Sequence, residues 1–173
     1  MATKTASLIL TGGDLRFEAT SGSGHTIVLE DRHGDSAMRP AELIPIALAG
    51  CTAMDVISIL RKKRQPVDRY EVRASGQQED DHPNAFTRVD VVHVVEGIGI
   101  NPDAVRRAIE LSATKYCSVG ATLSSGGVEI HHAYVLRDDT GEGPMTEVVV
   151  TGPHQAPAAT AGMAGRQPKA DAT

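Results

Sequence analysis

A long apolar segment dominates the pattern of hydrophobic and polar positions along this chain. Leu43–Leu60 contains few polar side chains besides a thiol, and these are Thr52, Asp55 and Ser58. Pro40 suits the first position of a helix, where an N–H group has no intrahelical partner, and Pro66 is a stop signal. We therefore predict one helix over Arg39–Arg64. Because it is apolar on nearly all faces, it belongs inside a protein.

The charges and small residues of this segment add to the prediction. Glu42 in the first turn and the basic cluster Arg61–Arg64 in the last turn suit the two ends of the helix macrodipole. We interpret the basic cluster as a solvated helix end rather than a surface for nucleic acid. Small residues in the middle would let another backbone approach closely, namely Ala47, Ala49, Gly50 and Ala53. Cys51 lies among them.

Shorter apolar runs on both sides of the helix predict strands. The predicted strands are Ala6–Thr11, Leu15–Ala19, Thr26–Glu30, Asp68–Gln78, Ala85–Glu96 and Val128–Leu136. Asn101 and Pro102 begin a second helix, whose apolar positions recur at three and four residues as far as Tyr116. Cys117 lies at or just past its end. Strand groups separated by helices, with hairpin-length links, favour an antiparallel α+β domain.

The composition changes after these elements. Met145–Thr151 has the residues of a further strand, whereas Gly152–Thr173 is rich in Ala, Pro, Gly and polar residues. We predict one domain over residues 1–136 and a C-terminal extension over 137–173 that is largely disordered. A chain of 173 residues is long enough for one domain with a substantial core.

Composition argues against several classes of function. The chain has a net charge of −5, no Trp, two Phe and three Tyr, which argues against a base-stacking platform and a nucleic-acid partner. No apolar run reaches the roughly 18 residues that a membrane span needs. The opening MATKTASLILTGG lacks the pattern of a secretory signal. We expect a cytoplasmic protein with no membrane partner.

The two cysteines leave several interpretations open. In a cytoplasmic chain they do not predict a structural disulfide framework. Cys51 fits a small buried hydrophobe, because free Cys is among the most buried residue types. Neither cysteine has metal-ligand spacing, and His131 and His132 fit the alternating faces of a strand, so we expect no metal and no cofactor. A Cys–His nucleophile stays open without a short motif. A two-thiol peroxidase needs a low-pKa thiolate, a nearby cation and a resolving thiol.

Two cysteine motifs resemble a known family. PAELIPIALAGCTAMDVISIL and, later in the chain, LSATKYCSVGATL are similar to sequences of the OsmC/Ohr family of osmotically induced and organic hydroperoxide resistance proteins. The second motif, with Ser-Val after its cysteine, resembles most the OsmC-like branch. The similarity covers Ala6–Leu136. It implies the OsmC-like fold, in which antiparallel sheets wrap around two central helices in an intertwined homodimer.

The resemblance also implies an activity. The best-known members of the family reduce hydroperoxides, organic ones especially, by using thiols. By that similarity Cys51 is the peroxidatic thiol, its sulfenic acid is resolved by Cys117, and a dithiol reductant reopens the bridge. We therefore predict a thiol peroxidase that acts on small hydroperoxides. The alternative is a non-enzymatic OsmC-like redox sensor or small-ligand-binding protein.

The residues that would activate the thiol match the family less well. In hydroperoxide-resistance members an Arg follows a Gly-Gly pair near the start and pairs with the thiolate, whereas this chain has Asp14 there. Arg16, on the same strand face, is our substitute, and Arg32 and Arg39 are rivals. A second difference follows Cys117: the family has Pro after this cysteine, whereas this chain has Ser118.

An acidic residue completes the candidate catalytic set of Cys51, Cys117, Glu42 and Arg16. The family's acid lies ten positions before the cysteine, where this chain has Ala41, and Glu42 lies nine before it, as in the OsmC-like branch. Nine residues of helix span about 13 Å, which no side chain bridges. We therefore expect each site to combine the two thiols of one chain with Glu42 and an Arg of the other.

Overall fold

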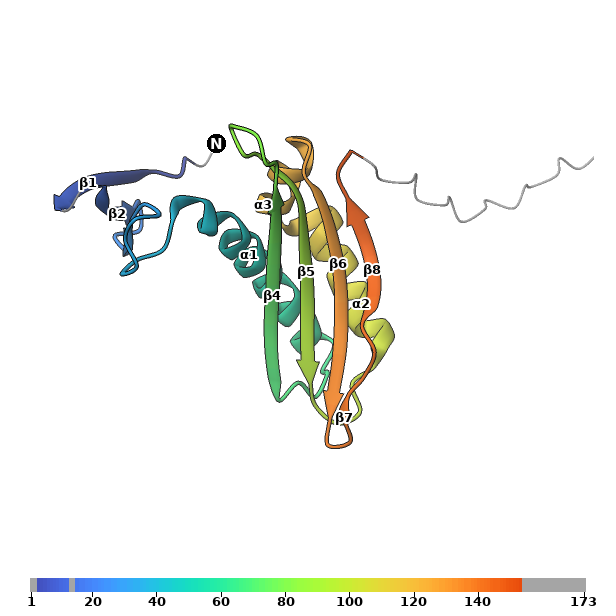
Figure 1. Cartoon of the computed structure of the whole chain (residues 1–173). Helices are drawn as coiled ribbons and strands as arrows, with labels where there is room; N and C mark the ends of the chain where they lie inside the picture. Colours follow the sequence, from blue (N-terminus) through green and yellow to red (C-terminus); the bar gives the residue numbers. More distant parts are fainter. Residues whose placement is uncertain (1–2, 13–14, 154–173) are drawn as a thin grey trace, which may run out of the picture.

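The computed structural model describes residues 3–12 and 15–153, which form an α+β structure of two sheets with helices (Figure 1). The helical segments are the 3₁₀ turn Pro40–Glu42, α1 (Leu43–Lys62), α2 (Pro102–Leu111), the π-helical turn Ser112–Tyr116 and α3 (Ser118–Ser125). The strands are β1 (Ala6–Gly12), β2 (Arg16–Ser21), β3 (Thr26–Leu29), β4 (Arg69–Gln78), β5 (Phe86–Glu96), β6 (Glu129–Asp138), β7 (Gly141–Glu142) and β8 (Thr146–Thr151).

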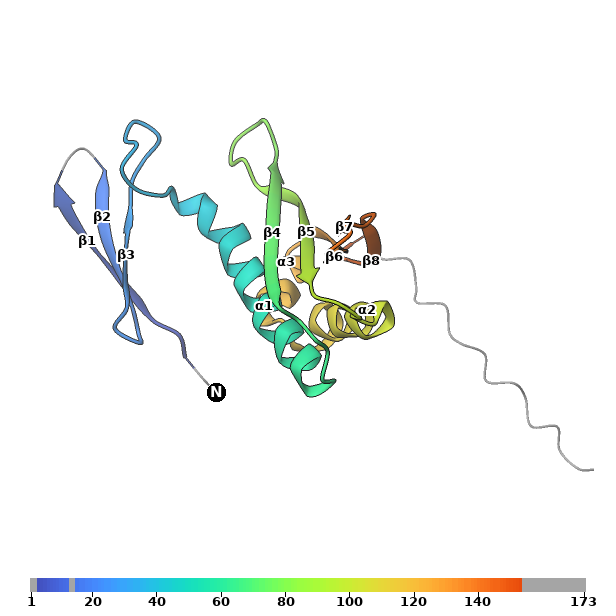
Figure 2. The same ribbon diagram turned by 90° about the horizontal axis from the view of Figure 1, so that it is seen from below.

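The two sheets lie apart from one another. Strands β1, β2 and β3 form an antiparallel meander, and the larger sheet has the order β4-β5-β6-β7, with β8 also paired to β6. In Figure 2 the meander stands beyond the first turns of α1, whereas the helices pack against one face of the larger sheet. The larger sheet and its helices therefore form the core, and the meander projects from it.

The larger sheet is mixed rather than antiparallel. Strands β5 and β6 run parallel, with Val91 beside His132 and His93 beside Tyr134. Our prediction of wholly antiparallel sheets was wrong for this pair. The reason is that α2 and α3 link the two strands, and such a crossover returns the chain to the end from which the first strand started.

Helix α1 with its 3₁₀ first turn confirms the long helix predicted over residues 39–64. Its fully buried side chains recur every four residues and are Leu48, Thr52, Val56 and Leu60. On another face Ile46 and Met54 are 53% and 73% exposed. Contrary to our expectation, Pro40–Lys62 is long and apolar enough to cross a membrane by length and composition. In this fold it is a partly buried core helix, packed against α2 and β4.

The segment around Cys117 differs from the sequence prediction. The second helix changes into a π-helical turn at Ser112, where Cys117 N donates to Ser112 O over 2.9 Å. Helix α3, which the sequence did not predict, begins immediately afterwards. Cys117 is its N-cap, and Gly120 N donates to Cys117 Sγ over 3.2 Å. The thiol therefore lies at a junction between two helical segments.

The larger sheet continues past the predicted limit of the domain at residue 136. Strand β6 ends at Asp138, and β8 pairs with β6, which confirms the further strand predicted over Met145–Thr151. Of the segment Gly152–Thr173 that is predicted to be disordered, residues 154–173 lie outside the described residues. Asp14, at which the match to the family's Arg fails, also lies outside them.

Two apolar clusters form the core between helices and sheet. One cluster contains Val56 and Leu60 of α1, and the other contains Leu48 of the same helix. The elements α1, β5 and β6 each contribute residues to both clusters. On each of them one buried polar residue separates the two sets, namely Thr52 on α1, His93 on β5 and His132 on β6. A polar layer therefore crosses the core.

Candidate functional site: a thiol pair between helices and sheet

The structure brings the two cysteines together. Cys51, in the middle of α1, is partly buried, and Cys117 is 3% exposed. Both thiols are free, and they pack in one apolar cluster with Leu48 of α1 and with Val89 and Val91 of β5. Gly120 of α3 lies beside Cys117, and a Cβ added there would meet Cys117 Sγ at 3.4 Å, an ordinary van der Waals contact.

The surroundings of Cys117 keep its thiol protonated. Burial and a hydrogen bond with Cys51 raise the pKa of Cys117 to about 12, and the charge of Asp55 acts in the same direction. The hydrogen bond from Gly120 N opposes them and lowers the pKa. Burial wins because an apolar surrounding disfavours the thiolate. At neutral pH the side chain of Cys117 is therefore a neutral thiol that carries its proton.

A buried hydrogen-bond network lies beside the thiol pair. Ser112 Oγ is 3.0 Å from Thr52 Oγ1 and 3.0 Å from Asp55 Oδ2. Ser112 and Thr52 are fully buried. Thr52 and Asp55 follow Cys51 by one and four residues on α1, and the carbonyl of Ser112 accepts from Cys117 N. The network therefore joins the helix that carries one thiol to the turn that carries the other.

The two histidines of the polar layer lie beside one another in the sheet, and Tyr70 of β4 contacts one of them. Tyr70 Oη lies 2.6 Å from His93 Nδ1, and the rings of His93 and His132 stack with centroids 6.0 Å apart. Burial is the main cause that lowers the pKa of His93 to about 3 and that of His132 to about 4. Within the described residues His93 Nε2 and His132 Nδ1 have no hydrogen-bond partner. Both imidazoles are therefore held neutral.

Arg16 and Glu42 lie elsewhere in this chain. Arg16, on β2 of the separate meander, contacts Ser36 and forms an ion pair of 3.6 Å with Glu30. Glu42, at the start of α1, forms an ion pair of 3.5 Å with Arg39 and accepts from its backbone N–H over 2.7 Å. Arg32 is exposed in the loop before the helix. Within one chain the structure therefore assembles the thiols without either predicted activating residue.

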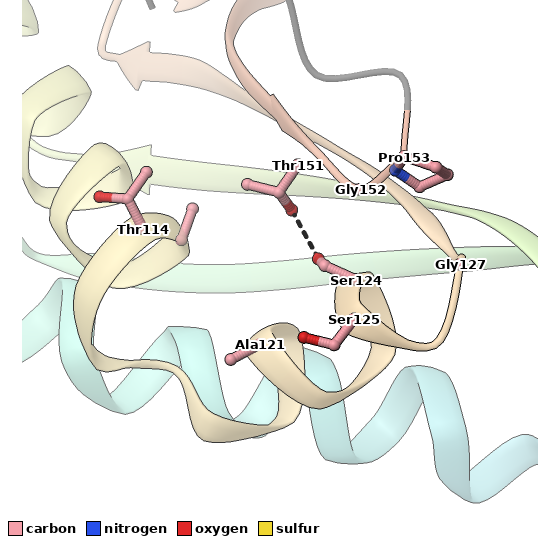
Figure 3. Close-up of a pocket in the computed structure, with 9 residues that line it drawn as sticks. Thr114, Ala121, Ser124, Ser125, Gly127, Thr151, Gly152 and Pro153 are labelled. Atoms are coloured by element: carbon pink, nitrogen blue, oxygen red, sulfur yellow. Dashed lines mark hydrogen bonds between the residues drawn. The ribbon is translucent and has the colours of Figure 1, made fainter. Parts of the chain in front are cut away.

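A cavity of about 520 Å³ lies between the π-helical turn, α3 and the end of β8 (Figure 3). It is lined by small and hydroxyl side chains of the π-helical turn, α3 and the end of β8, and Ser124 and Thr151 bond across it over 3.0 Å. Neither cysteine lines it. We place the candidate site at the thiols because their chemistry is specific. The cavity presents only neutral groups.

Over residues 3–12 and 15–153 there is no group of three or more His, Cys, Asp or Glu side chains arranged to hold a metal ion. His131 and His132 point to opposite faces of β6, as predicted: His131 contacts Glu129, and His132 lies in the core.

Sequence reasoning missed the polar layer. Thr52 and Asp55 are polar exceptions in an apolar helix, and their spacing of one and four residues from Cys51 is a signal that they lie close to it. His93 interrupts a row of valines on β5, which is a detectable signal for a buried polar residue. Ser112 carried no signal of its own, because its partners come from a helix sixty residues away in sequence.

Comparison with known proteins identifies the family. The OsmC-like protein family matches residues 33–133, and the chain belongs to it. Protein YhfA of Escherichia coli strain K12 is 41% identical over 120 residues, which cover 69% of this chain and 89% of YhfA.

Solved structures support the same fold. A hypothetical protein from Aquifex aeolicus is 26% identical with a TM-score of 0.70, covering 80% of this chain and 99% of that one. An OsmC-like protein from Mycoplasma pneumoniae, 15% identical, has a TM-score of 0.64 and covers 78% of this chain and 95% of its own. The resemblance stated from the two cysteine motifs is therefore confirmed.

Proposed function

We propose that this protein is a cysteine-based thiol peroxidase that reduces small, and especially organic, hydroperoxides in the cytoplasm. One observation carries the proposal: two free thiols pack in one cluster, one partly exposed and one buried. An organic hydroperoxide resistance protein from Elizabethkingia anophelis has the same fold, with a TM-score of 0.59 at 14% identity. That likeness concerns the fold alone.

The exposure of the two thiols supports different roles for them. Cys51 is the more accessible, so its thiolate attacks the hydroperoxide, the O–O bond breaks, and the alcohol leaves with a proton as Cys51 becomes a sulfenic acid. Cys117 then attacks this sulfur, and its proton leaves with the hydroxyl group as water while the disulfide forms. The departing hydroxyl takes up the proton of Cys117, so Cys117 loses its proton as it attacks the sulfur of Cys51. A dithiol reductant restores both thiols by exchange.

A homodimer is part of the proposal. The apolar side chains Leu8, Ile9 and Leu10 of β1 are more than half exposed, as are Ile46 and Met54 of α1. Exposed apolar surface of this kind marks an interface. A second copy that covered α1 with its own meander would bury this surface. It would also bring the Arg16 and Glu42 of one chain toward the thiols of the other.

A non-enzymatic redox sensor or small-ligand-binding protein is the second candidate. The observation that favours it is the placing of Arg16 and Glu42 in ion pairs of their own, away from the thiols of the same chain. A sensor needs two thiols that form a disulfide but not a fast peroxidatic reaction.

Counting thiols separates the two functions. Reduced protein is mixed with one equivalent of cumene hydroperoxide, and free thiols are measured over time together with turnover under dithiothreitol. A peroxidase loses two thiols per chain rapidly and then consumes peroxide continuously. Slow or absent thiol loss, with both cysteines shown to be reduced at the start, would contradict the proposed function.

A further inference from the structure

The side chain and the carbonyl of Ser112 bond to different parts of the candidate site. Its hydroxyl lies 3.0 Å from both Thr52 and Asp55 of α1, and its carbonyl accepts from Cys117 N over 2.9 Å. A hydroxyl has one hydrogen to donate, and a carboxylate only accepts, so Ser112 donates to Asp55. Ser112 is therefore a buried link between the helix of one thiol and the backbone of the other.

The link occurs where the chain departs from regular helix. The π-helical turn Ser112–Tyr116 gives the segment before Cys117 a wider turn than an α-helix, and such turns are frequent at functional sites. The bonds of Ser112 to Thr52 and Asp55 tie this turn to α1, in addition to the apolar packing around Cys117. Packing is not directional, so it would hold Cys117 near Cys51 less tightly than a hydrogen bond to a charged group does.

Asp55 adds an electrostatic effect to this geometry. It follows Cys51 by one helical turn and carries the acidic charge that acts on Cys117. The other elements around Cys117 present apolar side chains, namely Leu48 of α1, Val89 and Val91 of β5 and Ile130 of β6. The remaining groups that affect its titration are Cys51 and the N–H of Gly120. Farther along the sheet, His93 and His132 are neutral.

We propose that Ser112 and Asp55 are positioning residues for the resolving step. Ser112 holds the segment of Cys117 against the helix of Cys51, and Asp55 fixes Ser112 by accepting the hydrogen of its hydroxyl group. The inference rests on the proposed function, in which Cys51 is oxidised by a hydroperoxide and Cys117 closes the disulfide. The atom balance is that given above, and neither positioning residue gains or loses a bond.

The positioning effect is tested without peroxide. The full chain is equilibrated in glutathione redox buffers, and the fraction with a Cys51–Cys117 disulfide gives the effective concentration of one thiol at the other. We expect Ser112→Ala to lower it about tenfold, the size of one buried hydrogen bond to a charged group. Ser58→Ala, at an exposed position of α1, is the matched control and should leave it unchanged. Equal values for Ser112→Ala and the wild type would overturn the proposal.

Asp55 is tested in the same redox buffers. Asp55→Asn keeps an oxygen that can accept from Ser112 but removes the charge, so the hydrogen bond becomes weaker. We expect Asp55→Asn to lower the effective concentration, by less than Ser112→Ala does. Asp68→Asn, at an exposed position, should not change it. An unchanged value in Asp55→Asn would overturn the role of Asp55.

The peroxidase function and the positioning role of Ser112 and Asp55 can be disproved independently of one another. If the wild type keeps its thiols in cumene hydroperoxide, the proposed function fails, while the glutathione measurement still decides the role of Ser112. If Asp55→Asn does not fold, Ser112→Ala decides the positioning role by itself. Thermal unfolding of every variant shows whether a changed effective concentration reflects the site or a loss of folded protein.

Discussion

Tyr70 Oη lies 2.6 Å from His93 Nδ1, and this contact anchors an imidazole at a fully buried position of the core. His132 stacks on the same ring from the neighbouring strand. Two buried imidazoles with lowered pKa values make the stability of the fold depend on pH.

Acid should destabilise this protein well above the pH at which carboxylates titrate. In the unfolded chain both histidines bind protons below pH about 6.5, whereas folding lowers the pKa of His93 to about 3 and that of His132 to about 4. The unfolded state therefore binds more protons, and stability falls as the pH falls from about 6.5 toward 4. At pH 5 each histidine should cost about 2 kcal/mol relative to pH 7.5.

Urea unfolding of His132→Gln at pH 7.5 and pH 5 measures this effect. The variant should lose about 2 kcal/mol less than the wild type over that interval. His33→Gln removes an exposed histidine and should behave like the wild type. The same pH dependence in His132→Gln and the wild type would contradict the assignment of the acid sensitivity to the buried pair.

Cysteine variants should lose different numbers of thiols to cumene hydroperoxide. Under the proposed roles, wild-type protein loses both thiols, and Cys117→Ser loses one, because the sulfenic acid at Cys51 finds no second thiol. Cys51→Ser should lose none and consume no peroxide. It should still fold, since a hydroxyl in place of the thiol costs on the order of 1–3 kcal/mol. Turnover at the wild-type rate in Cys51→Ser would rule out its peroxidatic role.

Charge on the exposed face of α1 should disrupt the proposed dimer. Met54 is 73% exposed on this helix, and Met145, 67% exposed before β8, lies away from it. Met54→Glu would bury an unpaired charge in an apolar interface and should weaken association by about 3 kcal/mol or more. Met145→Glu should have no effect.

Sedimentation at micromolar concentration measures this. The interface should bury more than about 2,000 Å² if folding and association are coupled. A wild-type protein that sediments as a stable folded monomer would refute the dimer.

The sequence predicted α1 well because its two ends carry explicit signals. Pro40 and Glu42 start it, and the basic residues before Pro66 end it, so the helix was defined without tertiary information. The meander and β4–β5 were equally predictable, since short links between apolar runs specify antiparallel neighbours. The two cysteines came together as their motifs implied.

The parallel pairing of β5 with β6 was not predictable in the same way. It depends on α3, whose residues Ser118–Ser125 are small and polar and give no clear helical periodicity. The thiol environment was hidden for a related reason: Ser112 meets Asp55 only because the crossover folds back over α1. Local patterns describe elements, whereas contacts between distant elements arise from packing.

The composite site gives the last prediction. Glu42 is bound to Arg39 at the start of α1 and lies nine residues, about 13 Å of helix, from Cys51, so it cannot reach the thiol of its own chain. Arg16 lies on the separate meander with Glu30. Cys51 also gains little from the helix macrodipole, which acts within the first turn. Under the proposed function we expect the activating cation to come from a strand such as the one that carries Arg16, or from the second copy, and we expect Glu42 of the second copy to orient it.

Mixing two inactive variants tests this arrangement. In a heterodimer of Cys51→Ser with Glu42→Ala, one site carries both lesions and the other is intact. After random subunit exchange, half of the dimers are heterodimers with one active site of two, so about a quarter of the wild-type activity should return. An active Glu42→Ala parent would contradict the role of Glu42. No recovery from two inactive parents, with exchange confirmed by mass-tagged chains, would show that each site is built from a single chain.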